Sequence, residues 1–322
     1  MEFTYHRLAR SAPGYRWWKP LVTGLIALGI CFGFLIVLVV LLLASTLVLP
    51  ELRPLITKLA AGTIDNSLPV VLALSLSSVA VLLPSVWLAR LIMGPRPVGL
   101  LSSIAGRLRW RWMARLIPAV VIAYGASTLF SILLLPLLTG ESIPPAVVSS
   151  STWIVVLVAV LLVPLQATAE EFFFRGYLAQ TIGGWLKHPL FAILLPVPLF
   201  TISHPQYDVW GLIDVSVFAV VAGWLVWRTG GLEASIVAHV VNNTVIFVIG
   251  AFGLVDVNSK TGGPVEVVIS ALTLALYAWL VLRAAKRFGL ERVRVIALPP
   301  PPDPETIVHS ASDTEGAVTP RG

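Results

Sequence analysis

The chain has 322 residues, of which 57% are hydrophobic and only 12% are charged. Soluble domains carry about 25% charged residues, so this composition excludes a water-soluble enzyme, a disordered chain and a fibrous repeat. The net charge of +6 is compatible with a nucleic-acid partner, but basic residues beside membrane helices explain the same excess, so no nucleic-acid partner is expected. The single cysteine, Cys31, excludes an internal disulfide framework and a cysteine-based metal site.

Eight apolar runs follow one another along the chain. The first covers 21–49 and is much longer than the apolar core of a secretory signal, which has about 7–15 residues, so an uncleaved transmembrane helix is expected there. The other runs cover 67–89, 116–138, 147–169, 189–203, 210–227, 232–252 and 265–282. Because a membrane helix needs about 20 residues, the sequence predicts an all-α polytopic membrane protein with about eight transmembrane helices. The fifth run is short and contains Pro196 and Pro198, so a kinked or broken helix is expected there.

The positions of the basic residues predict the topology. All but three of the 22 Lys and Arg residues fall on the side of the N-terminus if eight helices cross the bilayer; the three are Arg53, Lys58 and Lys260. Cytoplasmic segments of membrane proteins are enriched in Lys and Arg. Both termini are therefore expected in the cytoplasm, with the chain in the plasma membrane as a multi-pass protein.

Three regions follow from this topology. Residues 1–20 are expected to form a basic cytoplasmic N-terminus, and 21–290 a helical transmembrane domain. Residues 291–322 contain the run Pro299–Pro302 followed by small and acidic residues, which is typical of a disordered tail.

Ionisable groups inside a membrane are costly and mark functional candidates. In this chain the polar residues of the apolar runs gather between 170 and 243: Glu170, Glu171, Arg175, His204, Asp214, Glu233, His239, Asn242 and Asn243. Glu171 and Arg175 are four residues apart, so they share a helix face and are expected to form an ion pair. Glu170 is rotated from Glu171 by about 100° and points elsewhere.

The same spacing recurs on two later helices. Phe200 and His204 are four residues apart, which lets the phenyl ring pack beside the imidazole, and His239 and Asn243 also share one face. If these helices converge with Glu170, one carboxylate, two imidazoles and one carboxamide meet in a cavity among the fourth, fifth and seventh helices.

That set of groups has a plausible hydrolytic chemistry. A carboxylate can take a proton from water, and a histidine can orient that water or pass a proton to the leaving amine. A second histidine and an asparagine NH2 can donate to a developing oxyanion. No Ser, Cys or Thr stands at a similar spacing with a base, so a covalent acyl-enzyme has little support. Metal binding is a rival use of these side chains, but there is no HExxH and His204 and His239 lie on different runs, so no metal or other cofactor is expected.

Simpler explanations exist for each residue alone. Glu171–Arg175 is also explained as a structural ion pair, Asp214 as a structural or cavity-facing carboxylate, and Asn243 as an interhelical contact. Glu233 follows two glycines at a helix start, where a carboxylate complements the helix dipole. The alternative function is a non-proteolytic membrane protein, either a transporter with a Glu/His proton relay or a binding scaffold. Transporters often show inverted repeats with polar sites in both halves, whereas the polar groups here lie in one half.

Three motifs in order resemble a known family. The segment EEFFFR at 170–175 fits EExxxR, FTISH at 200–204 fits FxxxH, and HVVNN at 239–243 fits HxxxN. In this order on successive membrane helices they resemble the CPBP family, which comprises the type II CAAX prenyl endopeptidases and the bacteriocin-processing, or Abi, proteins. The resemblance covers roughly 150–250.

The resemblance implies an intramembrane, metal-independent glutamate-type endopeptidase that cuts peptide bonds in membrane-associated or lipidated proteins or peptides. Glu170 would be the general base on water, aided by His204. His239 and Asn243 would stabilise the oxyanion. The supporting residues would be Glu171, Arg175 and Phe200.

The chain positions also predict the depth of this site. Glu170 follows the whole fourth run, so it is expected near the cytoplasmic third of the bilayer. The cavity is expected to open to the cytoplasm, because water must reach a hydrolytic base.

Overall fold

The computed structural model describes residues 1–140 and 142–296, so most of the predicted tail lies outside the described residues. Phe3–Arg294 form one compact unit, and Met1–Glu2 form a second, small unit with Val295 and Ile296. In the small unit the Ile296 N–H donates to the Met1 carbonyl at 2.9 Å, and the Met1 ammonium donates to the Ile296 carbonyl at 2.8 Å. All of the helices belong to the larger unit.

The described chain is almost entirely helical. Its two strands have three residues each, β1 (Glu2–Thr4) and β2 (Val293–Val295). The α-helices, in chain order, are α1 (Lys19–Val48), α2 (Arg53–Ala60), α3 (Pro69–Ala80), α4 (Leu82–Met93), α5 (Trp110–Leu129), α6 (Leu135–Thr139), α7 (Thr152–Glu170), α8 (Ala179–Trp185), α9 (Pro189–Leu194), α10 (Pro196–Ile202), α11 (Val209–Thr229), α12 (Glu233–Ala251) and α13 (Pro264–Phe288). Three short 3₁₀ helices are η1 (Tyr5–Ser11), η2 (Pro50–Leu52) and η3 (Val98–Leu101), and two π-helices are η4 (Phe130–Leu134) and η5 (Glu171–Leu178).

Seven helical stretches of the described chain are long and apolar enough to cross a membrane: Lys19–Val48, Pro69–Met93, Trp110–Thr139, Thr152–Trp185, Val209–Thr229, Glu233–Ala251 and Pro264–Phe288. The all-α polytopic class is therefore confirmed. The remaining apolar run, Pro189–Ile202, is a shorter helix, broken between α9 and α10. This break was predicted, and it falls before Pro196, which cannot donate the backbone hydrogen bond that would continue α9.

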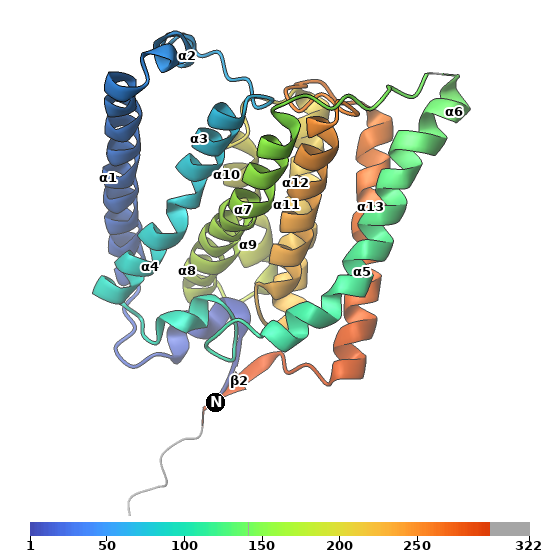
Figure 1. The fold of residues 1–322 in the computed structure, drawn as a ribbon. Helices are drawn as coiled ribbons and strands as arrows, with labels where there is room; N and C mark the ends of the chain where they lie inside the picture. The colour runs from blue at the N-terminus through green and yellow to red at the C-terminus, as the bar shows by residue number, and fades with distance from the viewer. Residues whose placement is uncertain (141, 297–322) are drawn as a thin grey trace, which may run out of the picture. The chain divides into compact units, whose positions relative to one another are not determined.

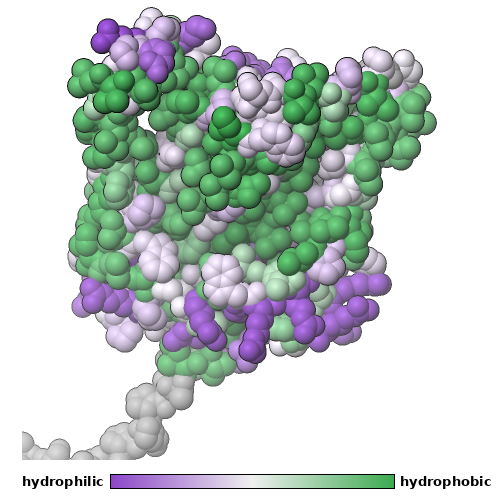
Figure 2. Space-filling view, in the orientation of Figure 1, coloured by the Kyte–Doolittle hydropathy of each residue, from purple (hydrophilic) through white to green (hydrophobic). Residues whose placement is uncertain are grey.

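The outward faces of these helices are apolar. The 30-residue α1 buries only four residues, while Leu25 and Val48 are 69% and 81% exposed. Apolar surface of this extent is unfavourable in water and suits contact with lipid. Figure 2 shows hydrophobic residues over most of the visible face, with the strongly hydrophilic residues gathered chiefly along its lower edge.

The helices run up and down between two sets of loops (Figure 1). We call one set the basic end; its segments are 3–18, 94–109, 186–188, 229–232 and 289–294. We call the other the far end; its segments are 49–68, 142–151, 203–208 and 252–263. Hydrogen bonds tie the far-end loops together, from the Val147 N–H to the Phe252 carbonyl at 2.8 Å and from Asn258 Nδ2 to Asp65 Oδ1 at 2.8 Å.

The basic end is held by an ion pair between distant segments. The fully buried Glu233 carboxylate accepts from the Arg109 backbone N–H at 2.9 Å, from its Nε at 2.8 Å and from its Nη2 at 2.7 Å. The Ile104 N–H also donates to the Gly230 carbonyl at 2.9 Å. These contacts fasten the segment before α5 to the turn between α11 and α12, so Glu233 does more than complement a helix dipole.

Candidate active site

The two adjacent glutamates lie where α7 gives way to a π-helix. Glu170 is the last residue of the 19-residue α7, and Glu171 is the first of the 8-residue η5, which continues into the 7-residue α8. Together these elements form one helical stretch from Thr152 to Trp185. Glu170 therefore lies near the middle of this helical stretch, which continues well past the apolar run. Its depth in the bilayer remains a prediction. Single π-helical turns often mark functional sites.

The Glu171 carboxylate is bonded to two buried side chains, Arg175 and His239. Its Oε1 accepts from Arg175 Nη1 at 2.9 Å and from His239 Nδ1 at 2.8 Å. Glu171 is fully buried, and Arg175 and His239 are also buried. The predicted Glu171–Arg175 ion pair is thus present, and the same carboxylate also fixes the imidazole of α12.

Glu170 faces the other nitrogen of that imidazole. Its Oε2 lies 3.5 Å from His239 Nε2, and this oxygen is buried with no hydrogen-bond partner among the described residues. Because Nδ1 is bonded to Glu171, Nε2 is the ring nitrogen of His239 that faces Glu170.

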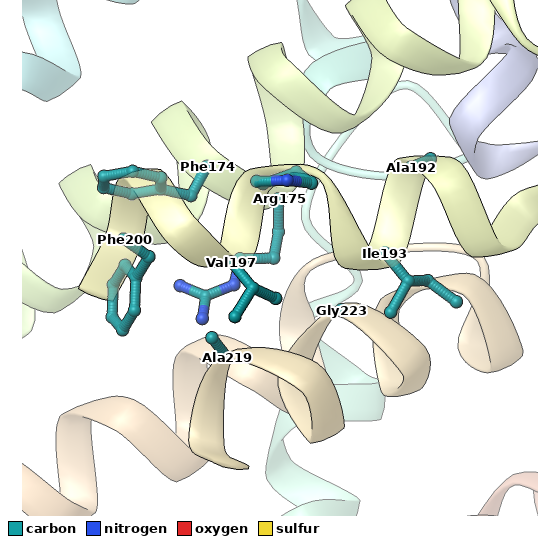
Figure 3. A pocket seen from close by; sticks show the side chains of 9 residues that line it. Phe174, Arg175, Ala192, Ile193, Val197, Phe200, Ala219 and Gly223 are labelled. Carbon is teal, nitrogen blue, oxygen red and sulfur yellow. The ribbon is translucent and has the colours of Figure 1, made fainter. Parts of the chain in front are cut away.

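Two aromatic rings, those of Phe200 and Phe218, pack against the buried guanidinium of Arg175. The Arg175 guanidinium carbon lies 4.1 Å from the centre of the Phe200 ring and 5.4 Å from that of Phe218. Figure 3 shows the guanidinium beside Phe200, Val197 and Ala219, at the edge of a small void between η5, α9, α10 and α11. A cation over an aromatic face is stabilised by the quadrupole of the ring, so Phe200 supports the buried charge of Arg175.

His204 is oriented by its own helix end. Its Nδ1 donates to the Phe200 carbonyl at 2.8 Å, so the neutral ring keeps a free lone pair on Nε2. Its ring packs 4.8 Å from the Phe200 ring, as the spacing predicted, and stacks on Tyr207 at 6.2 Å.

Asn243 lies one helical turn beyond His239 on α12. Its Nδ2 donates to Gln166 Oε1 at 3.2 Å, and its Oδ1 accepts from Asn242 Nδ2 at 3.1 Å. The carboxamide is therefore held by α7 on one side and by its own helix on the other.

A cavity of about 570 Å³ joins several of these groups. Its wall includes His204, His239 and Asn243, with further residues from α5, α11 and α13. Glu170 belongs to α7 and contacts His239, which forms part of the cavity floor. Volumes of about 300–1,000 Å³ are usual for ligand-binding sites.

The cavity reaches the far end of the helices. Ser259, Thr261, Gly262 and Gly263, from the loop between α12 and α13, line it there. The cavity therefore reaches the end opposite to the basic segments, so the expected cytoplasmic opening and the expected cytoplasmic basic end do not both hold. The reason is that α10 stops at Ile202 and leaves space between α5, α11 and α13 on the far side of His239.

Within 1–140 and 142–296, no group of three or more His, Cys, Asp and Glu side chains is arranged to hold a metal ion. The absence of a catalytic metal remains a prediction.

Comparison with known proteins gives a family match for the region that contains the candidate site. Residues 149–245, which contain Glu170, His204, His239 and Asn243, match the family model described as type II CAAX prenyl endopeptidase Rce1-like. This part of the chain is similar to that family. The chain is also 30% identical over 187 residues to the uncharacterized protein YyaK of Bacillus subtilis (strain 168). That similarity covers 56% of this chain and 60% of YyaK, so the chain matches less than two thirds of the relative. No solved structure matches the chain significantly.

Two residues of the Rce1-like region were missed by sequence reasoning. Gln166 bonds Asn243, and its signal was its position four residues before Glu170 on the same helix face. Phe218 packs 4.9 Å from the His239 ring, and nothing in the sequence distinguished it from other apolar residues of α11. Asp214 lies on the cavity wall, which agrees with the cavity-facing alternative stated for it in the sequence analysis.

Proposed function

We propose that this chain is an intramembrane glutamate-dependent endopeptidase. One observation carries the proposal: Glu170 has an unpartnered buried oxygen 3.5 Å from Nε2 of His239, and His239 lines the cavity. The neighbouring Glu171 is held through its Oε1 by Arg175 and His239, and it is fully buried, so it is shielded from water. Environments that differ this much let two adjacent carboxylates take different roles.

The groups support one sequence of steps. Glu170 takes a proton from water as the water oxygen attacks the carbonyl carbon of the peptide bond, and the carbonyl oxygen becomes an oxyanion. His239 and Asn243 donate hydrogen bonds to that oxyanion. The carbon–nitrogen bond then breaks, and the proton taken by Glu170 passes to the leaving amine directly or through His204. The products are one free carboxylate and one free amine, and no covalent intermediate with the protein is formed.

The Rce1-like match and the apolar helices support a substrate at the membrane. The expected substrates are peptides or proteins that are associated with the bilayer or carry a lipid. A peptide cleavage assay with purified protein tests the proposal. Release of new carboxyl and amino termini supports it, whereas uptake or binding without cleavage supports the alternative of a transporter or scaffold.

The topology gives a separate prediction. The basic end is expected to face the cytoplasm, with both termini inside and the chain in the plasma membrane. Reporter fusions after Arg115 and after Arg287 should both give a cytoplasmic signal, and a fusion after Lys260 should give the opposite signal. An external signal from either of the first two contradicts this orientation.

The oxyanion donors give a second prediction. His239→Ala and Asn243→Ala should each lower the rate of cleavage by roughly 10²–10³-fold, because each removes a donor to the transition state. The measurement is kcat and KM on one cleaved peptide, with Thr244→Ala as a control on the same helix. An unchanged kcat in both variants contradicts their proposed role.

A further inference from the structure

The two ends of the large unit differ in charge. Among the described residues, only Arg53, Lys58 and Lys260 of the Lys and Arg residues belong to the far-end loops. The same end carries a larger set of carboxylates: Glu51, Asp65, Asp208, Asp256 and Glu266. Nearly all other basic side chains lie at or near the basic end, which matches the strongly hydrophilic lower edge in Figure 2. The positive-inside rule therefore assigns the far end to the outer side of the membrane.

The cavity extends from this far end down to the candidate site. Its wall on α13 runs from Glu266 to Leu274, and its wall along α5, η4 and the start of α6 runs from Tyr124 to Leu135. At 1.5 Å per residue these walls span about 12 Å and 16 Å. An extended chain advances about 3.3–3.6 Å per residue, so this depth accommodates four or five extended residues.

The far-end mouth of the cavity is formed by the loop between α12 and α13, which hydrogen bonds tie to the start of α11. Asp208 is the N-cap of α11, and its Oδ1 accepts from the Gly211 N–H at 2.9 Å. Its Oδ2 accepts from the Gly262 N–H at 3.2 Å, and its own N–H donates to the Lys260 carbonyl at 2.8 Å. The hydrogen bond from the Gly211 N–H, together with that from Gly262, holds the pKa of Asp208 below its usual range, so this carboxylate stays ionised at neutral pH.

The opposite side of the cavity floor is closed. Packed side chains lie between the floor and the basic end, and they include the fully buried Trp112, Leu225, Ala234, Tyr277 and Val281. The Tyr277 hydroxyl donates to the Ala234 carbonyl at 2.9 Å and joins α13 to α12 in this layer. Below it, the Arg109–Glu233 ion pair fastens the loops of the basic end.

We propose that the site receives its peptide from the outer side of the membrane, through the mouth formed by the loop between α12 and α13. This inference rests on the proposed function. The substrate class is then an unfolded segment of an exported or outer-leaflet polypeptide, presented as a chain end or flexible stretch that fits the depth of the cavity. A protein confined to the cytoplasm does not reach the site in this arrangement.

Cysteine labelling tests the direction of access. Cys31 is the only cysteine, so a Cys31→Ser chain provides a background without thiols. Three single substitutions are added to it: Thr261→Cys at the mouth, Ser127→Cys on the cavity wall, and Arg292→Cys at the basic end. A membrane-impermeant maleimide is applied to intact cells and to permeabilised cells.

Thr261→Cys and Ser127→Cys are expected to react in intact cells, and Arg292→Cys only after permeabilisation. Reaction of Ser127→Cys only after permeabilisation overturns the proposal. Failure of Ser127→Cys to react in either preparation also overturns it, because solvent then does not reach the cavity from the mouth.

Peptides cleaved by the purified protein provide the second measurement. They should be cut when added to right-side-out vesicles and spared when added to inside-out vesicles; the reverse result overturns the proposal. The labelling does not require turnover. If Ser127→Cys is labelled in intact cells but no peptide is cleaved, the access route from the outer side is still supported. That result contradicts only the endopeptidase function.

Discussion

Replacing Glu170 with glutamine is expected to lower turnover by roughly 10²–10⁴-fold, the range that general acid–base catalysis contributes, and to leave the protein folded. Glutamine has nearly the same shape, but its amide cannot accept the proton from water. The fold should survive because Glu170 Oε2 has no hydrogen-bond partner to lose among the described residues, and it lies 3.5 Å from His239 Nε2.

The measurement is kcat on a cleaved peptide, with the unfolding midpoint recorded in the same preparation. Glu51→Gln is the matched control, because Glu51 is an exposed carboxylate in η2 and does not line the cavity. Glu170→Asp retains a base on a shorter side chain and should give a rate between wild type and Glu170→Gln. Wild-type turnover in Glu170→Gln means that Glu170 is not the base.

Replacing Arg175 with methionine is expected to destabilise the protein by about 3–5 kcal/mol, the usual cost of breaking a buried ion pair. Methionine keeps an unbranched apolar stem, so the main change is loss of the charge. Glu171 then lies fully buried with only His239 to balance it, and Phe200 loses the cation above its ring. Turnover should fall too, because Glu171 positions the imidazole of His239.

A double variant separates charge from packing. Glu171→Gln with Arg175→Met leaves no uncompensated buried carboxylate at position 171, so it should recover part of the stability lost in Arg175→Met. The midpoint of unfolding in detergent measures both variants. An Arg175→Met protein as stable as the wild type shows that the pair contributes little, and a double variant less stable than the single one shows that packing dominates.

The parts of this structure that depend on short spacings could be predicted from the sequence. Continuous apolar runs gave the helical membrane class, and Pro196 marked the break in the fifth helix. The four-residue spacing of Glu171 and Arg175 gave their ion pair, and that of Phe200 and His204 gave the contact between their rings.

Contacts between distant segments could not be predicted in this way. His239 meets Glu171 across 68 positions of the chain, and Glu233 meets Arg109 across 124. Both contacts depend on which helix faces turn toward each other, and one sequence without relatives does not specify this. The end of the helices that the cavity reaches could not be predicted either, because it depends on where α10 stops and on how the loop between α12 and α13 folds.

The short helix pair α9–α10 has a consequence for the surrounding lipid. Pro189–Ile202 spans only about 20 Å at 1.5 Å per residue, against about 30 Å for the hydrocarbon core of a bilayer. Leu190, Leu194 and Leu199 lie on its exposed side, so acyl chains must shorten or bend to cover it. Such mismatch costs fractions of a kcal/mol per Å. The membrane should therefore be thinned locally beside the site, and thicker vesicles with longer acyl chains should slow peptide cleavage relative to thin ones.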